Sequence, residues 1–170
     1  MKKYKGFTLI EILIVLVVIG ILSSMMVIAS NESTTTAKAS NIVSNLRNFS
    51  MAAMAFYTDH VEEYSTLPEN SPDPLTNEVK KYLHNEGNIT DGSKYKVVRT
   101  VEDNTYQVWW AGYVFDTKDN EREREKLEGR TDSANLKGSA NENPPADQDG
   151  NKYKKDHASV WIKIRSSKKK

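Results

Sequence analysis

The sequence predicts an α+β protein in which a long amino-terminal helix packs on a small antiparallel sheet. Three observations predict this fold. Residues 7–29 are almost entirely apolar, apolar residues then recur at helical spacing from Ala39 to Phe56, and three later segments are rich in β-branched and aromatic residues. We therefore expect a hydrophobic transmembrane half of the helix over residues 7–29, an amphipathic half over residues 30–60, and a globular head over residues 61–170.

The composition sets limits on structure and function. With 170 residues, the chain is long enough for one folded head but short for two ordinary domains. It has no cysteine, which excludes disulfides, a thiol nucleophile and a thiolate metal site. Its 24 Lys and Arg nearly balance its 23 Asp and Glu, so there is no overall basic field of the kind that drives nucleic-acid binding.

The apolar segment is long enough to cross a membrane. As a helix its 23 residues would extend roughly 34 Å at ~1.5 Å per residue, and the hydrocarbon core of a bilayer is ~30 Å thick. Lys2, Lys3 and Lys5 precede it, which places the amino terminus in the cytoplasm by the positive-inside rule. The sequence thus predicts a single-pass inner-membrane protein with an exported head.

Three other interpretations account less well for this segment. A cleavable secretory signal would use residues 27–29 as its cleavage site, but it needs an apolar stretch of only ~7–15 residues and has no use for Glu11. A plain membrane anchor does not explain Glu11 either, because a carboxylate at bilayer depth costs up to ~2.5–3.5 kcal/mol. The length and unbroken apolarity argue against the core helix of a soluble protein.

Residues 5–15, KGFTLIEILIV, resemble the site that prepilin peptidase recognises in type IV pilins and type II secretion pseudopilins. Gly6 stands before the cut, Phe7 would be the new amino terminus, and Glu11 follows four residues later. Gly20 stands where this family usually has a helix glycine. The resemblance covers about the first 30 residues. It implies a leader peptide at residues 1–6, cleavage between Gly6 and Phe7, N-methylation of Phe7 and a pilin-like fold.

The resemblance also implies how subunits assemble and with which partners. In the family the new amino group, here on Phe7, is thought to pair with the acid of a neighbouring subunit, here Glu11. A buried ion is tolerable mainly when it is paired, so this arrangement is physically reasonable. The implied partners are the prepilin peptidase and methyltransferase, an inner-membrane assembly platform, and other pilins in a homo- or hetero-oligomeric filament.

Two family roles remain open at the level of sequence. Many major pilins carry a proline shortly after the helix glycine, whereas residues 23–28 here contain none. This absence argues against a major pilin and leaves minor pilins and pseudopilins open. The resemblance implies either a subunit of an extracellular pilus, which supports adhesion, twitching motility or DNA uptake, or a pseudopilin of a periplasmic piston. A minor tip pilin that binds DNA or a surface ligand is a further alternative.

The remaining elements follow from local patterns. An apolar stripe predicts an amphipathic helix that ends near Asp59 or His60. A proline-containing loop is expected over residues 67–74, and a short helix over residues 76–85 with Thr76 as its N-cap. Residues 94–101 and 105–115 read as a β-hairpin, and residues 158–164 as a third strand. The stripe consists of Ala39, Ile42, Leu46, Phe49, Ala53 and Phe56.

A polar insertion at residues 116–157 separates the second and third predicted strands. Residues 120–130 would form a surface helix, and the rest reads as a loop. An unstructured insertion of this length is uncommon in a compact domain and is usually functional or mobile. We expect it to face neighbouring subunits or the environment, and a solvated, variable surface loop is the alternative.

Few residues suggest binding chemistry. Asp147, Asp149 and Asn151 resemble the start of a calcium loop, but Ala158 stands where an EF-hand would have its closing Glu, so an ordinary turn is the alternative. Some pilins and pseudopilins bind calcium in a loop near the carboxy terminus.

No catalytic constellation appears in the sequence, and the expected function is not enzymatic. His60, His84 and His157 stand apart from one another. The tryptophans Trp109, Trp110 and Trp161 are expected to pack in the sheet. Lys163, Arg165 and residues 168–170 form a local basic patch that could attract DNA, an acidic polysaccharide or an acidic subunit surface, and a tail that is only solvated is the ordinary alternative.

Overall fold

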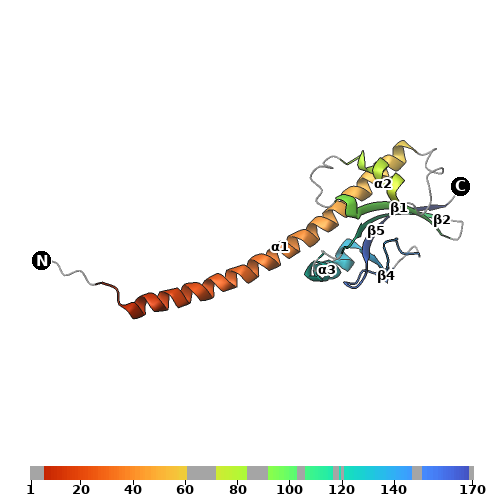
Figure 1. Cartoon of the computed structure of the whole chain (residues 1–170). Helices are drawn as coiled ribbons and strands as arrows, with labels where there is room; N and C mark the ends of the chain where they lie inside the picture. The colour runs from red at the N-terminus through yellow and green to blue at the C-terminus, as the bar shows by residue number, and fades with distance from the viewer. Residues whose placement is uncertain are drawn as a thin grey trace. The chain divides into compact units, whose positions relative to one another are not determined.

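The computed structural model of the chain describes residues 6–60, 72–83, 92–102, 106–116, 119, 121–146 and 151–168. It shows an α+β architecture with a long amino-terminal helix and a five-stranded antiparallel sheet (Figure 1). The chain divides into two compact units, residues 1–37 and residues 38–170. Helix α1 (Leu9–Asp59) contributes to both units, and the sheet belongs to the second.

The second half of α1 packs its predicted apolar stripe against the sheet. All six stripe residues are buried, and Val43 and Ala52 join them. The Phe49 ring stacks on Tyr95 at 5.2 Å between centroids, which fixes the helix against the first strand of the sheet. The helix ends at Asp59, as the sequence predicts.

The sheet has the strand order β1-β2-β5-β3-β4, in which β3 is Lys137–Ser139 and β4 is Asn151–Lys152. Strands β1 (Tyr95–Glu102) and β2 (Tyr106–Val114) form the predicted hairpin, and β5 (Ser159–Lys168) is the predicted third strand, extended at its carboxyl end. A short 3-10 helix, η3 (Gly92–Lys94), precedes β1, so the strand begins one residue later than expected. The turn at residues 103–105 lies outside the described residues.

Side chains from one face of the sheet form the main core with α1. This core also includes Leu75 and Val79 from α2 (Pro72–Lys80). Trp109 contacts Phe56 and Tyr57 of α1 through its ring, at 6.4 and 5.7 Å between centroids. The sheet residues of this core are Tyr95, Val97, Trp109, Ala111, Tyr113 and Val160.

The opposite face of the sheet carries a second buried cluster, Val98, Val108, Trp110 and Trp161. The six-membered part of the Trp161 ring lies directly over Gly112, where an added Cβ would come within 2.2 Å of the ring. Trp161 Nε1 donates to Ser159 Oγ at 2.7 Å, and Ser159 Oγ donates to the Asn141 carbonyl at 2.6 Å. The insertion therefore reaches back to the tryptophans of this face.

The structure corrects the expectation that most of the insertion is loop. The predicted surface helix is present as α3 (Glu121–Glu128), but α4 (Thr131–Ala134), β3 (Lys137–Ser139) and β4 (Asn151–Lys152) follow it. Three insertion residues, Leu127, Leu136 and Tyr153, are buried in the main core. The described part of the insertion is thus folded against the head.

The structure also corrects the position of the short helix. Helix α2 begins at Pro72 and ends at Lys80, whereas we expected a loop up to residue 74 and a helix from Thr76. Proline suits the first turn of a helix because its missing N–H would have no partner there. Thr76 is buried instead of capping: its hydroxyl accepts the Val97 N–H at 2.8 Å and so joins α2 to β1.

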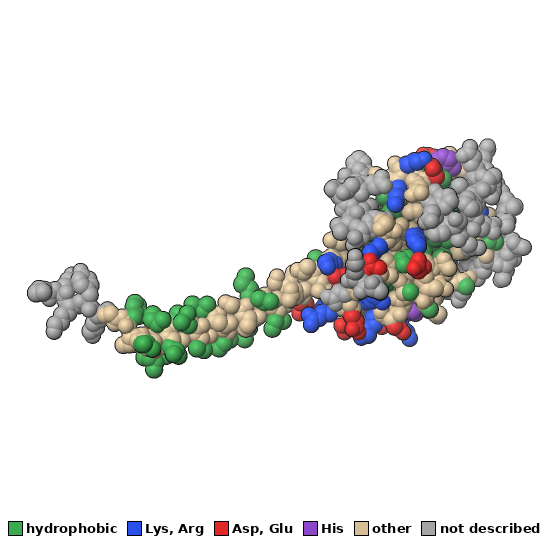
Figure 2. Space-filling view, in the orientation of Figure 1, with side chains coloured by type: hydrophobic (Ala, Val, Ile, Leu, Met, Phe, Trp, Pro, Cys, Tyr) green, Lys and Arg blue, Asp and Glu red, His purple; other side chains and the backbone are tan. Residues whose placement is uncertain are grey.

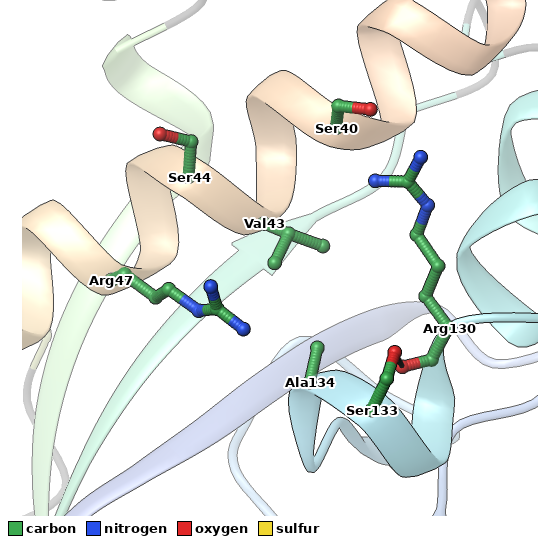
Figure 3. Close-up of a pocket in the computed structure, with 7 residues that line it drawn as sticks. All are labelled: Ser40, Val43, Ser44, Arg47, Arg130, Ser133 and Ala134. Carbon is green, nitrogen blue, oxygen red and sulfur yellow. Dashed lines mark hydrogen bonds between the residues drawn. The ribbon is translucent and has the colours of Figure 1, made fainter.

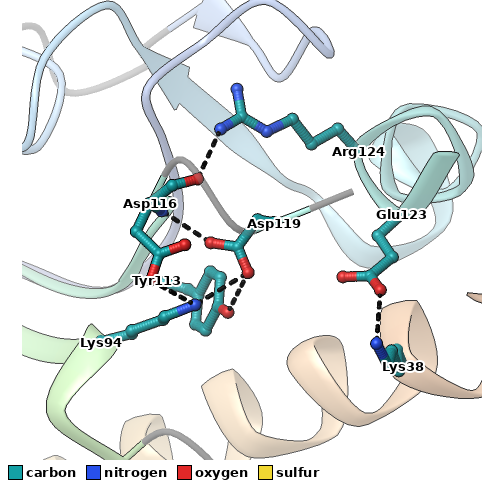
Figure 4. A network of polar contacts seen from close by, with 7 residues as sticks. All are labelled: Lys38, Lys94, Tyr113, Asp116, Asp119, Glu123 and Arg124. Atoms are coloured by element: carbon teal, nitrogen blue, oxygen red, sulfur yellow. Dashed lines mark hydrogen bonds and ion pairs between the residues drawn. The ribbon is translucent and has the colours of Figure 1, made fainter. Parts of the chain in front are cut away.

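A polar network holds the start of the insertion to the edge of the sheet (Figure 4). Lys94 Nζ lies 2.8 Å from Asp119 Oδ1 and 3.2 Å from Asp116 Oδ2. The Tyr113 hydroxyl donates to Asp119 Oδ1 at 3.2 Å, and Asp119 Oδ2 accepts the Asp116 N–H at 2.6 Å. A further ion pair, Lys38 to Glu123 at 2.9 Å, joins α1 to α3.

Burial and this network shift proton affinities. Burial alone would lower the pKa of the Lys94 ammonium, but its hydrogen bonds to Asp119 and Asp116 outweigh this effect and raise the pKa. Burial, followed by the charge of Asp119, raises the pKa of the Tyr113 hydroxyl. Burial likewise raises the pKa of Tyr153, whose hydroxyl has no hydrogen-bond partner among the described residues.

We predict that Gly112→Ala destabilises the head. The new Cβ would overlap the Trp161 ring, and overpacking of a buried site typically costs about 1–3 kcal/mol. Urea unfolding of the full chain in detergent, followed by tryptophan fluorescence, measures the loss. Gly129→Ala is the matched control, because its Cβ would meet only ordinary contacts at 3.7 and 3.8 Å. Equal stability of the two variants would contradict the close packing of Trp161 on Gly112.

We also predict that the free energy of unfolding falls as the pH rises above the ordinary tyrosine pKa of 10.0. Lys94, Tyr113 and Tyr153 keep their protons to higher pH when folded than when unfolded, so alkali favours the unfolded chain. Tyr153→Phe should keep its neutral-pH stability and show a shallower decline. Urea midpoints measured at pH 9, 10 and 11 test this, and a flat profile in the unsubstituted chain would contradict it.

Candidate processing and assembly site

The amino-terminal part of α1 is an apolar helix whose side chains are exposed. Figure 2 shows hydrophobic side chains gathered along it, whereas Lys, Arg, Asp and Glu side chains gather on the second unit. Among the described residues, α1 is the one helix long and apolar enough to cross a membrane, and no residue of its most apolar stretch is buried. The exposed large side chains are Phe7, Leu9, Ile10, those of residues 12–19, Ile21, Leu22 and those of residues 25–28.

The free energy at stake in this surface is large. Burying one large aliphatic or aromatic side chain is worth about 1.5–3 kcal/mol, so the exposed set corresponds to tens of kcal/mol. A folded domain is stable by only about 5–15 kcal/mol. The segment therefore requires an apolar environment, either lipid or other protein.

Glu11 lies in the first turn of this helix and takes part in a capping box with Thr8. Its Oε2 accepts hydrogen bonds from the Thr8 backbone N–H at 2.7 Å and from the Thr8 hydroxyl at 2.8 Å. In return, the Glu11 N–H donates to Thr8 Oγ1 at 3.3 Å. The pair thus satisfies backbone groups that a helix start leaves without partners. The single acid of the apolar segment already has hydrogen-bond partners within its own chain.

Sequence reasoning missed Thr8. The signal for it is present, because Thr-x-x-Glu before an apolar run is the signature of a capping box. The same acid also fits a pairing with another subunit, and that interpretation does not involve Thr8.

The two glycines of the segment have open surroundings. A Cβ added to Gly6 or to Gly20 would meet no atom within 4 Å. Gly20 lies inside α1, where glycine costs roughly 0.5–1 kcal/mol relative to alanine. No packing contact within the chain's described residues explains this glycine. A small residue at a helix surface instead permits the close approach of another helix.

The helix accommodates its hydroxyl groups by internal hydrogen bonds. Ser24 Oγ donates to the Ile21 carbonyl at 2.7 Å, and Thr34 donates to the Ser30 carbonyl at 2.9 Å. Such bonds allow Ser and Thr in a helix that lacks water around it.

Comparison with known proteins identifies the segment. Residues 1–27 match the family described as the prokaryotic N-terminal methylation motif. The chain carries the prepilin cleavage signal of type IV pilins and pseudopilins. This signal and the apolar helix fit a membrane-anchored precursor of a pilin or pseudopilin, and they point to a structural subunit. Neither the curated proteins nor the solved structures contain a match to the chain.

Among the described residues, the other candidate side chains are not brought together into one site. Of the proposed calcium ligands, Asn151 is exposed on β4, whereas Asp147 and Asp149 lie outside the described residues. His60 stacks on Phe56 at 4.5 Å, and His157 Nδ1 accepts the Lys154 N–H at 3.0 Å. His84 is also outside the described residues.

The basic patch of β5 is divided by a register shift. The shift lies between Trp109 and Trp110, and it pairs Arg165 with Trp109 but Lys163 with Trp110. These two tryptophans belong to the clusters on opposite faces of the sheet. The Arg165 guanidinium lies over the Tyr57 ring at 4.1 Å and so contributes to the helix side. Residues 169–170 lie outside the described residues.

We predict that Thr8→Val frays the start of α1. Valine keeps the shape of threonine but removes the hydroxyl that exchanges hydrogen bonds with Glu11, and loss of a cap costs about 0.5–2 kcal/mol. Hydrogen exchange at the Glu11 and Ile12 amides should accelerate severalfold in micelles. Thr34→Val, which loses a hydroxyl bond farther along the helix, is the control. If both variants exchange alike at these two amides, the capping box is not what orders the helix start.

Proposed function

We propose that this chain is a structural subunit of a type IV pilus-like filament, made as a precursor and cleaved by prepilin peptidase between Gly6 and Phe7. The observation that carries the proposal is the exposed apolar surface of residues 7–28, which contains Glu11 as its one charged side chain. Such a surface can exchange lipid for the same surface of other subunits. The matched motif over residues 1–27 supports the processing step.

Cleavage and N-methylation would act on the exposed end of the segment. Phe7 is 85 % exposed and precedes the first turn of α1, so an enzyme can reach its backbone nitrogen. Gly6 presents no side chain to a protease cleft. Removal of residues 1–6 takes away Lys2, Lys3 and Lys5, which hold the precursor to the cytoplasmic side.

In the filament, the new amino group of Phe7 on one subunit would pair with Glu11 of its neighbour. Because Thr8 already gives Oε2 of the Glu11 carboxylate two hydrogen bonds in the free chain, the acid can stay in the membrane before it meets that amine. The paired charges then set the register between subunits, while the aliphatic side chains supply most of the association free energy. An inner-membrane platform would deliver the subunits.

The location of the assembled fibre separates the two forms of this proposal. A fibre on the cell surface would serve adhesion, twitching motility or DNA uptake, whereas a periplasmic fibre would be a secretion pseudopilus. Immunogold electron microscopy with antibodies against the head distinguishes them.

We predict that two substitutions in the motif block different steps, one the cleavage and the other the assembly. Gly6→Val should block cleavage, because its side chain hinders entry into the protease, and should leave Met1 at the amino terminus. Glu11→Ala should still be cleaved and should yield N-methyl-Phe7, but it should assemble at least about tenfold less fibre, since the charge that fixes the register is gone.

Peptide sequencing of the amino terminus and quantification of sheared filaments measure the two effects. Ser24→Ala is the matched control, because it changes the same helix away from its charged end. A Glu11→Ala chain that assembles normally would contradict the pairing, and a native chain that begins at Ser30 would contradict the processing.

A further inference from the structure

A pocket of about 260 Å³ lies between the second half of α1 and helix α4 (Figure 3). It belongs entirely to the second unit of the chain. Its lining combines two arginines with three hydroxyls over a small apolar floor. The lining residues are Ser40, Val43, Ser44, Arg47, Arg130, Ser133 and Ala134.

The two arginines come from different elements and point into the same space. Arg47 extends from α1 toward α4, and Arg130, which directly precedes α4, extends toward α1 beside Ser40 (Figure 3). Within the described ranges, neither guanidinium has an ion pair or a side-chain hydrogen bond. This differs from Lys38 and Lys94 nearby, whose ammonium groups contact carboxylates.

Two guanidinium groups that line the same pocket attract an anion more strongly than either would alone. Each guanidinium presents a planar fork of N–H donors that fits two oxygens of one anion. Ser44 is exposed at the pocket and adds a hydroxyl.

We propose that this pocket binds a phosphate group. A carboxylate has two oxygens and can satisfy one fork, whereas the tetrahedral phosphate offers oxygens to two forks and to the hydroxyls as well. The pocket holds about nine times the ~30 Å³ share of one liquid water, which leaves room for part of an esterified group beside the phosphate. Val43 and Ala134 form the apolar floor on which its carbon atoms would rest.

This site goes beyond filament assembly, because it lies on the head and uses neither Glu11 nor the apolar segment. The same chemistry could come from free inorganic phosphate or from a phosphodiester. The titration is therefore done with two probes, inorganic phosphate and glycerophosphoglycerol. Tighter binding of the diester identifies an esterified ligand, and equal or tighter binding of inorganic phosphate identifies the free ion.

The full chain in maltoside micelles, which contain no phosphate, is titrated by isothermal calorimetry. We expect saturable one-to-one binding with a Kd of about 1 mM or tighter for at least one probe. Arg47→Gln and Arg130→Gln should each weaken it at least about tenfold. Ser44→Leu should also weaken it by filling the pocket without a change of charge. Arg122→Gln, on the exposed surface of α3 and outside the pocket lining, should stay within about twofold.

Two results would overturn the proposal. One is the absence of saturable binding for both probes at concentrations up to about 10 mM. The other is binding that Arg122→Gln weakens as much as the pocket variants do, since this would indicate only a general attraction to positive charge. Processing and fibre yield of the pocket variants are also measured in the cells that produce them. Failure of this site is thereby distinguished from failure of the filament.

Discussion

The exposed apolar surface at the start of α1 is the constraint on which the biology of this chain depends. Its burial is worth more free energy than a folded domain gains in total, so the segment requires an apolar environment, either lipid or other protein. Two features serve this requirement. The Ser24 hydroxyl donates to a carbonyl of its own helix, and Thr8 exchanges hydrogen bonds with the N–H and one carboxylate oxygen of Glu11.

The head must fold by packing alone, because the chain has no cysteine and therefore no disulfide. It does so by covering both faces of its sheet. The second half of α1 and helix α2 bury one face, and the insertion reaches the other face through the hydrogen bonds that join Trp161, Ser159 and Asn141. Gly112 allows this packing because it has no side chain, so the Trp161 ring can lie directly on its backbone. The network around Lys94 and Asp119 then anchors the start of the insertion to the sheet.

The sequence predicted the elements whose pattern is periodic and failed where the partners are far apart in the chain. The stripe from Ala39 to Phe56 and the hairpin were predictable because each repeats at the spacing of a regular element. The insertion was not, because its core residues are single apolar positions among polar ones, and β3 and β4 have only three and two residues. The pocket was equally unpredictable from the sequence, because Arg47 and Arg130 are 83 positions apart and only the packing of α1 near α4 brings them to one pocket.

The capping box changes what Glu11 contributes to the proposed filament. If the carboxylate lacked partners in the membrane, pairing with an amine of another subunit would recover its whole desolvation penalty, and the charge would drive assembly. Because Thr8 already supplies two hydrogen bonds, assembly gains only the difference in free energy between these bonds and the pairing with the amine. In the proposed filament, assembly would then draw its strength from apolar contact and from close approach at Gly20, and its register from the acid. This division explains why a single charge can be kept in a segment otherwise selected for apolar surface.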